Sequence, residues 1–90
     1  MSINPVTERF AENMLIHRRR AGFSQEELGF RANLHRTEIS ALEVGSREAK
    51  IATVIKLAGA LSVTPNDLLA GIEWKAPPGL PLLGKLTVRD

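Results

Sequence analysis

The sequence predicts an all-α domain of five helices followed by an extended C-terminal tail that has room for one short strand. Apolar residues recur at intervals of three and four through most of residues 4–71, which is the period of an amphipathic helix. Residues typical of helix starts and helix stops separate these stretches. In the tail, prolines at 77, 78 and 81 exclude a helix, and residues 82–88 partly alternate between apolar and polar side chains, as in a strand.

The first helix is expected to begin near Asn4-Pro5 or Thr7 and to end at about Arg20. Asparagine before proline is a favoured start, because the asparagine side chain caps the helix and proline suits its first position. Gly22 is the expected stop. The buried stripe is predicted from residues spaced four, three and four apart, namely Phe10, Met14, His17 and Ala21.

Residues 24–45 predict two short helices joined by a tight turn. Ser24 and Glu27 fit the capping box that opens a helix. Asn33 is expected to end that helix, since asparagine tolerates a left-handed backbone better than most residues. The second helix is expected to begin after His35 as its cap and to stop at Gly45. The inward-facing residues of the pair are predicted to be Leu28, Ala32, Leu34, Ile39 and Leu42.

The fourth helix is expected over residues 51–61. Its apolar residues are too numerous for one stripe, so it is expected to be largely buried. The fifth helix has a strong start signal in Thr64 to Asp67, with threonine as cap, proline first and aspartate third. Leu68 and Leu69 are expected to be buried, and Gly71 is the expected stop.

Composition excludes several classes of site. The 90 residues suffice for one modest core, and the absence of cysteine excludes disulfides, thiolate metal sites and cysteine nucleophiles. His17 and His35 are far apart in the chain, so no metal, no cofactor and no catalytic residue is expected. The net charge of +2 indicates no global basic field. No signal peptide or membrane span is visible, which favours a cytoplasmic protein.

The second helix of the 24–45 pair carries a polar face suited to reading DNA. Residues 36, 37, 40 and 41 fall on one surface of a helix. In a helix-turn-helix the second helix enters the major groove, where arginine pairs with guanine and small apolar groups meet the thymine methyl. The predicted base-reading residues are Arg36, Thr37, Ser40 and Ala41.

Several separate segments resemble the lambda-repressor/Cro type of helix-turn-helix, the XRE family, in a single register. They are Ser24 to Leu28, Asn33-Leu34, Ile39-Ser40 and Glu43-x-Gly45, followed by an apolar helix and Val63-Thr64-Pro65. Residues 33–40 are particularly similar to restriction-modification controller proteins. The resemblance spans about residues 8–70. It implies a five-helix fold and a homodimer that binds inverted repeats in double-stranded DNA and regulates transcription.

The resemblance also implies supporting roles. Gln25 lies at a helix start, where free amides attract an anion, and matches a phosphate-binding glutamine of the family. Arg47 and Lys50 follow the recognition helix and are expected to contact phosphate, as is His35 if it does not only cap. Arg18 and Glu43 match an internal salt bridge of related phage repressors and are expected to be structural.

The chain is expected to consist of a DNA-binding domain, residues 1–71, and a C-terminal tail, residues 72–90, that serves as a dimerisation arm. A strand at 83–88 needs a partner, and the expected partner is the same strand of a second copy. Trp74 is expected either to anchor that interface or to fold back on the fifth helix. The expected dimer and tail residues are Ile72, Trp74, Leu83, Leu86 and Val88.

Two other functions compete with DNA-binding regulation. The protein could act mainly on another protein, as an antitoxin that neutralises a toxin or as a helix-turn-helix scaffold that bridges proteins. Copurification with a small partner would favour that function. An enzyme is rejected, because the sequence offers no nucleophile arrangement and no metal-ligand set.

Overall fold

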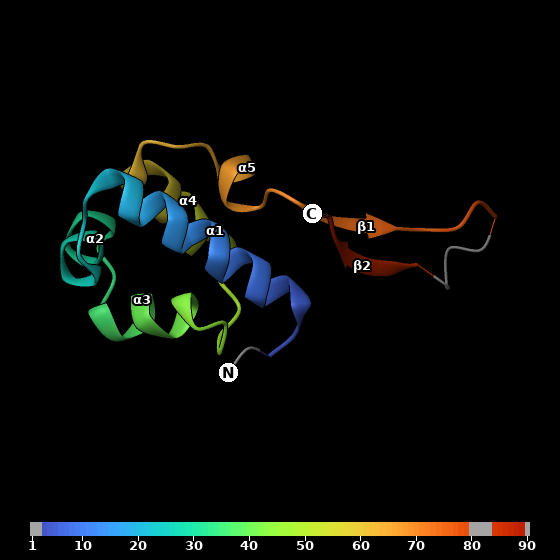
Figure 1. Cartoon of the computed structure of the whole chain (residues 1–90), viewed down its shortest axis with the longest axis horizontal. Coiled ribbons are helices and arrows are strands. Elements are labelled where there is room, and N and C mark those ends of the chain that lie inside the picture. The colour runs from blue at the N-terminus through green and yellow to red at the C-terminus, as the bar shows by residue number, and fades with distance from the viewer. Residues whose placement is uncertain (1–2, 80–83, 90) are drawn as a thin grey trace.

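The computed structural model describes residues 3–79 and 84–89 and shows a mostly helical protein with a small two-stranded sheet (Figure 1). The predicted five helices and extended tail are confirmed. The elements in chain order are α1 (Pro5–Ala21), α2 (Gln25–Ala32), α3 (Arg36–Glu43), α4 (Ile51–Leu61), α5 (Pro65–Leu68), β1 (Ile72–Lys75) and β2 (Lys85–Val88).

Local signals at the helix ends account for most of these boundaries. The Asn4 side chain accepts from the Thr7 amide at 2.9 Å, and Thr7 returns the bond as acceptor from the Asn4 amide at 3.2 Å. The Ser24 hydroxyl accepts from the Glu27 amide at 3.0 Å, but the Glu27 carboxylate pairs with Arg31 instead of returning to Ser24. The predicted capping box of α2 is therefore only half formed.

The turn between α2 and α3 has the predicted left-handed residue. Asn33 has φ 55° and ψ 48°, and its amide donates back to the last turn of α2. The Leu34 amide then donates to the Gly29 carbonyl at 2.8 Å. These two bonds reverse the chain within a few residues and bring the start of α3 against α2.

The short helix α5 has a complete capping box. The Thr64 hydroxyl accepts from the Asp67 amide at 3.2 Å, and the Asp67 carboxylate accepts from the Thr64 amide at 2.8 Å. The hydrogen bond from the Thr64 amide, and after it the hydrogen bond with the Thr64 hydroxyl, lower the pKa of the Asp67 carboxyl. However, α5 ends at Leu68 and not near Gly71, and Leu69 is exposed, so the prediction that Leu69 is buried was wrong.

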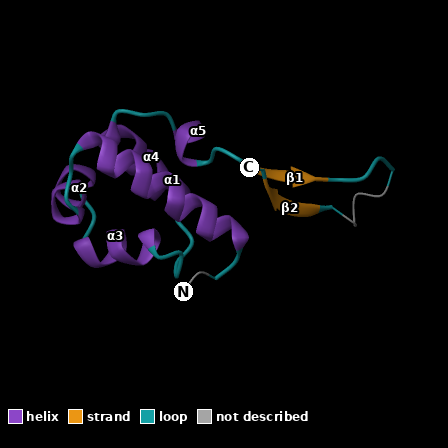
Figure 2. Ribbon diagram, in the orientation of Figure 1, coloured by secondary structure: helices purple, strands orange, loops and turns teal. Residues whose placement is uncertain are grey.

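The core is built from residues of all five helices, whose arrangement Figure 2 shows. The predicted stripe of α1 is correct for Phe10 and Met14, which are buried. It is wrong for Ala21, which is exposed at the end of the helix, while His17 is half-buried. The largest fully buried side chains come from all five helices: Met14, Leu28, Ile39, Leu42, Leu57 and Leu68.

The helix α4 is not largely buried, contrary to the prediction. Its inner face holds Leu57, Ala58 and Leu61, yet Ile51 is 82% exposed and Ile55 is 58% exposed. The physical reason is that α1 and α2 pack on one side of α4, and α5, with four residues, is too short to cover the other side. One apolar face of α4 therefore remains in water.

The tail forms a hairpin within one chain. Strand β1 pairs antiparallel with β2, with Ile72 opposite Val88 and Trp74 opposite Leu86. The predicted pairing of the tail strand with a second copy is thus wrong, because residues 72–75, which carried no strand prediction, supply the missing edge. The predicted residue Leu83 lies outside the described residues. No helix in the described part of the chain is long and apolar enough to cross a membrane.

Two glycines should respond to alanine with opposite signs. A Cβ at Gly29 would lie 2.6 Å from the Leu34 carbonyl oxygen, whereas a Cβ at Gly59 would meet nothing within 4 Å. We expect Gly29→Ala to destabilise the fold by about 1–3 kcal/mol through overpacking. Gly59→Ala in α4 should stabilise it by about 0.5–1 kcal/mol, since alanine restricts the unfolded chain. Urea unfolding followed by circular dichroism measures both changes. Destabilisation of equal size in the two variants would contradict the close approach at the turn.

Candidate nucleic-acid interface

The outward face of α3 is the candidate interface. Ile39 and Leu42 are fully buried and therefore fix the rotation of this eight-residue helix about its axis. The opposite surface then carries the predicted set at positions 36, 37, 40 and 41. Arg36 and Thr37 are exposed, and Ser40 and Ala41 are half-buried. The structure thus brings all the predicted base-reading residues to one polar surface.

The start of α3 is held by His35. Its Nδ1 accepts from the Thr37 amide at 3.2 Å, and the Thr37 hydroxyl lies 2.8 Å from the same nitrogen. The predicted helix cap at His35 is confirmed. Because the hydroxyl of Thr37 faces the cap, its methyl group is the part that remains available to a ligand. An available methyl group suits contact with the thymine methyl.

The end of α3 is held by a cluster around Glu43. The Arg18 Nε lies 2.5 Å from Glu43 Oε2, and the Arg18 Nη2 lies 3.0 Å from Oε1. Such a bidentate pair is among the stronger charge-assisted arrangements. Arg18 Nη1 also donates to the Phe23 carbonyl at 2.7 Å. The side chains of Arg18 and Glu43 are only 14% and 5% exposed, so the pair lies inside the protein.

Gln25 joins this cluster, which the sequence did not reveal. Its Nε2 donates to Glu43 Oε1 at 3.0 Å. The cluster therefore connects α1, the start of α2 and the end of α3. One amide donor of Gln25 is engaged in this bond. Within residues 3–79 and 84–89 its second donor and its carbonyl oxygen have no hydrogen-bond partner and can bind another ligand. The spacing in sequence could not show this contact, because Gln25 and Glu43 are 18 residues apart.

Two cations follow α3 in the loop that leads to α4. Arg47 and Lys50 are both exposed. Neither forms an ion pair with any other side chain in the described ranges, 3–79 and 84–89. Together with Arg36 at the first position of α3, they place unpaired positive charge at both ends of the candidate interface. This arrangement suits a polyanion that runs along the helix.

Within residues 3–79 and 84–89, no three side chains of histidine, aspartate or glutamate gather in a geometry that could hold a metal ion.

Comparison with known proteins agrees with this geometry. Residues 16–68 match the family described as helix-turn-helix. The control protein C.BamHI of Bacillus amyloliquefaciens is 44% identical over 50 residues, which cover 56% of this chain and 62% of that protein. The match thus spans less than two thirds of that relative's length.

Solved structures show the same fold. The restriction-modification controller protein C.AhdI from Aeromonas hydrophila superposes with a TM-score of 0.68 and 32% identity, covering 69% of this chain and 94% of that chain. The P22 c2 repressor, solved in complex with a synthetic operator, has a TM-score of 0.65 and 26% identity, and covers the same shares. The family match extends over more than half of the sequence and includes both helices of the motif, so this chain belongs to the XRE-type helix-turn-helix family of DNA-binding transcriptional regulators.

Proposed function

We propose that the protein binds specific double-stranded DNA as a symmetric homodimer on inverted repeats, with α3 in the major groove. The observation that carries this proposal is the polar face of α3, whose rotation is fixed by the buried residues Ile39 and Leu42. The relatives support it: one is named a control protein, another is a restriction-modification controller, and a third was solved on an operator. We propose the same class of regulatory role for this chain.

Base recognition begins with Arg36. It is the first residue of α3, is exposed, and has no ion-pair partner among the described side chains. Its guanidinium can bind guanine O6 and N7 through two hydrogen bonds, the commonest specific contact in the major groove. Thr37 and Ala41 offer methyl groups to thymine, and Ser40 offers a hydroxyl to a base or a phosphate.

Phosphate contacts would surround this reading face. Arg47 and Lys50 extend from the loop after α3, and His35 lies immediately before the helix. Gln25 is the first residue of α2, where free backbone amides favour an anion. Contacts of this kind set the register and the affinity of the protein on DNA, but they do not read sequence.

Dimerisation is supported by the uncovered side of α4. We call this surface the α4–α5 face and define it by Ile51, Ile55 and Leu69, which are all exposed. The three residues line one hollow together with Ala49, Val54 and Pro65. A contiguous apolar patch of this kind marks an interaction site. One α3 covers only a few base pairs, and a two-fold dimer would place two such helices roughly 34–36 Å apart, one turn of DNA.

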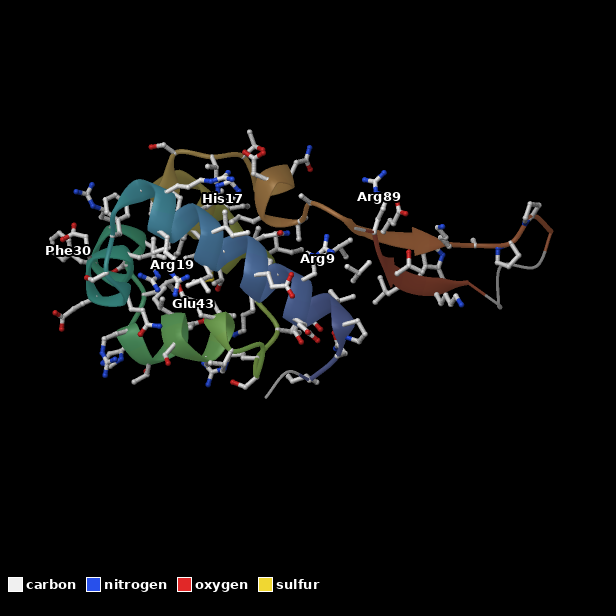
Figure 3. The ribbon with its side chains drawn as sticks, viewed as in Figure 1. Arg9, His17, Arg19, Phe30, Glu43 and Arg89 are labelled. Atoms are coloured by element: carbon white, nitrogen blue, oxygen red, sulfur yellow. The ribbon has the colours of Figure 1, made fainter. Side chains whose placement is uncertain are left out.

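Arg36→Ala should lower the affinity for the specific site by about 1–3 kcal/mol and affect random DNA much less. The reason is that the variant loses a base contact and keeps the phosphate contacts. Fluorescence anisotropy on matched operator and scrambled duplexes measures the difference. Arg89→Ala is the charge-matched control, since Figure 3 shows Arg89 on the hairpin, far from α3. Equal losses on both duplexes would make Arg36 a phosphate contact.

Arg47→Ala and Lys50→Ala should behave in the opposite way. Each should weaken operator and scrambled DNA alike and reduce the slope of log K against log salt by about one. The salt dependence of binding, compared with that of Arg89→Ala, provides the measurement. Unchanged slopes in both variants would exclude phosphate contacts at this loop.

Ile55→Asp should raise the dissociation constant of the dimer at least about tenfold, because a carboxylate would be buried in the interface. Sedimentation velocity gives the constant, and circular dichroism should show unchanged helix content, since Ile55 is already exposed in one copy. Phe30→Asp is the control: Phe30 is an apolar residue of α2 that is 85% exposed and lies at the end of the molecule opposite the hairpin (Figure 3). An unchanged dimer dissociation constant in Ile55→Asp would exclude the α4–α5 face as the dimer interface.

A further inference from the structure

The hairpin extends away from the helices as an arm, which we define as the described residues within 71–89. It leaves the helical body beyond α5 and accounts for much of the long dimension of the protein (Figures 1 and 2). The principal extents are 46, 25 and 23 Å. The arm lies outside residues 16–68, which match the helix-turn-helix family. It is therefore an addition to the DNA-binding unit.

The base of the arm is fixed to α1. Arg9 Nη1 donates to the Arg89 carbonyl at 2.6 Å, and the Arg89 amide donates to the Gly71 carbonyl at 2.6 Å. Gly71 has φ 86°, and a Cβ there would lie 2.7 Å from the Arg89 carbonyl oxygen. Glycine is thus required where the two ends of the hairpin meet. These contacts set the direction in which the arm leaves the body.

The two faces of the arm differ in chemistry. Residues directly opposite each other in an antiparallel pair lie on the same face, so Ile72, Val88, Trp74 and Leu86 share one side. Near the base, Ile72 and Val88 are half-buried. Farther out, Trp74 is 59% exposed and Leu86 is 58% exposed. The other side carries Glu73, Thr87, Lys75 and Lys85.

The indole of Trp74 has a contact within its own chain. It lies over Gly84, which is the diagonal neighbour of Trp74 on the opposite strand. A Cβ at Gly84 would come within 2.3 Å of Cζ2 of the ring, so no larger residue fits beneath it. An aromatic ring over a glycine stabilises a strand pair. This contact replaces the predicted packing of Trp74 on the fifth helix, and it reduces the entropy that a partner would have to remove on binding.

The apolar side of the arm continues the α4–α5 face. Ile72 and Leu86 line a hollow with Phe10, Val54 and Leu69. Val54 and Leu69 also line the neighbouring hollow that holds Ile51 and Ile55. The two hollows share Ala49, Val54 and Leu69, so apolar side chains connect α4 with the arm. Thr7, Arg47 and Glu48 also line the first hollow and add polar groups to this surface.

We infer that the apolar side of the arm, centred on Trp74 and Leu86, packs against the body of a second copy of this chain. This inference rests on the proposed dimer and assigns it a second contact region. The α4–α5 face alone is small, because α5 has four residues. Stable interfaces bury about 800 Å² per partner, roughly 20–30 residues a side. In a two-fold dimer each arm would extend over the other subunit, so the two arms enlarge the interface together.

The intrinsic fluorescence of Trp74 tests the inference directly in the full chain. The protein has one tryptophan and no tyrosine, so all emission reports on this residue. Over a series of rising protein concentrations, we expect acrylamide quenching of Trp74 to fall at least about twofold in the range where sedimentation shows dimers forming. The reason is that the second copy would cover a ring that is 59% exposed in one copy. A dimer in which Trp74 stays equally quenchable overturns the arm contact and leaves the proposed dimer intact. The absence of dimer at every concentration overturns both.

Variants on the two sides of the arm make the second test. Leu86→Glu retains Trp74 over Gly84 and should raise the dimer dissociation constant at least about tenfold, as should Trp74→Ala. Lys75→Ala, on the polar side of the same strand pair, is the control and should leave the constant unchanged. If Leu86→Glu leaves dimerisation unaltered, the inference fails. If Lys75→Ala weakens operator binding while Leu86→Glu has no effect on the dimer, the arm contacts DNA instead of a second copy.

Discussion

The internal ion pair between Arg18 and Glu43 is the constraint on which the outward face of α3 depends. An isolated helix of eight residues such as α3 is not stable in water, so its position must come from tertiary contacts. Ile39 and Leu42 supply the apolar part of those contacts, and Glu43 binds the end of α3 to Arg18 on α1 and Gln25 on α2. A buried pair of this kind contributes little net stability against an apolar replacement, yet loss of one partner is costly. The cluster connects three helices through one carboxylate.

The other half of the molecule follows from what the helices leave uncovered. Strand and helix elements bury their apolar residues only where a neighbour is available, and α5 is too short to cover α4. The isoleucines of α4 and the apolar side of the arm are exposed for the same reason, because no other element in the described part of the chain packs over them. In the proposed dimer one association would bury both surfaces and would also set the spacing of the two α3 helices. Base reading and dimerisation would then use separate surfaces of one small protein.

Predictions made from short spacings succeeded where the physics is local. The cap at Asn4, the left-handed Asn33 and the capping box of Thr64 and Asp67 each depend on residues four or fewer positions away. The half-formed box at Ser24 shows the limit of this reasoning. Glu27 could bond either the Ser24 amide or a cation one turn later, and it bonds Arg31 at 2.7 Å. A local pattern cannot decide between two local partners of similar strength.

The sequence by itself determined the helical class, the ends of most helices and the polar face of α3, because periodicity and capping are properties of neighbouring residues. Only the tertiary structure decided which side of α4 is covered, that β2 pairs with β1 of the same chain, and that Gln25 bonds Glu43. Each of these depends on residues distant in sequence. The apolar composition indicates how much surface favours burial, but the arrangement of the neighbouring helices and strands decides where that burial occurs.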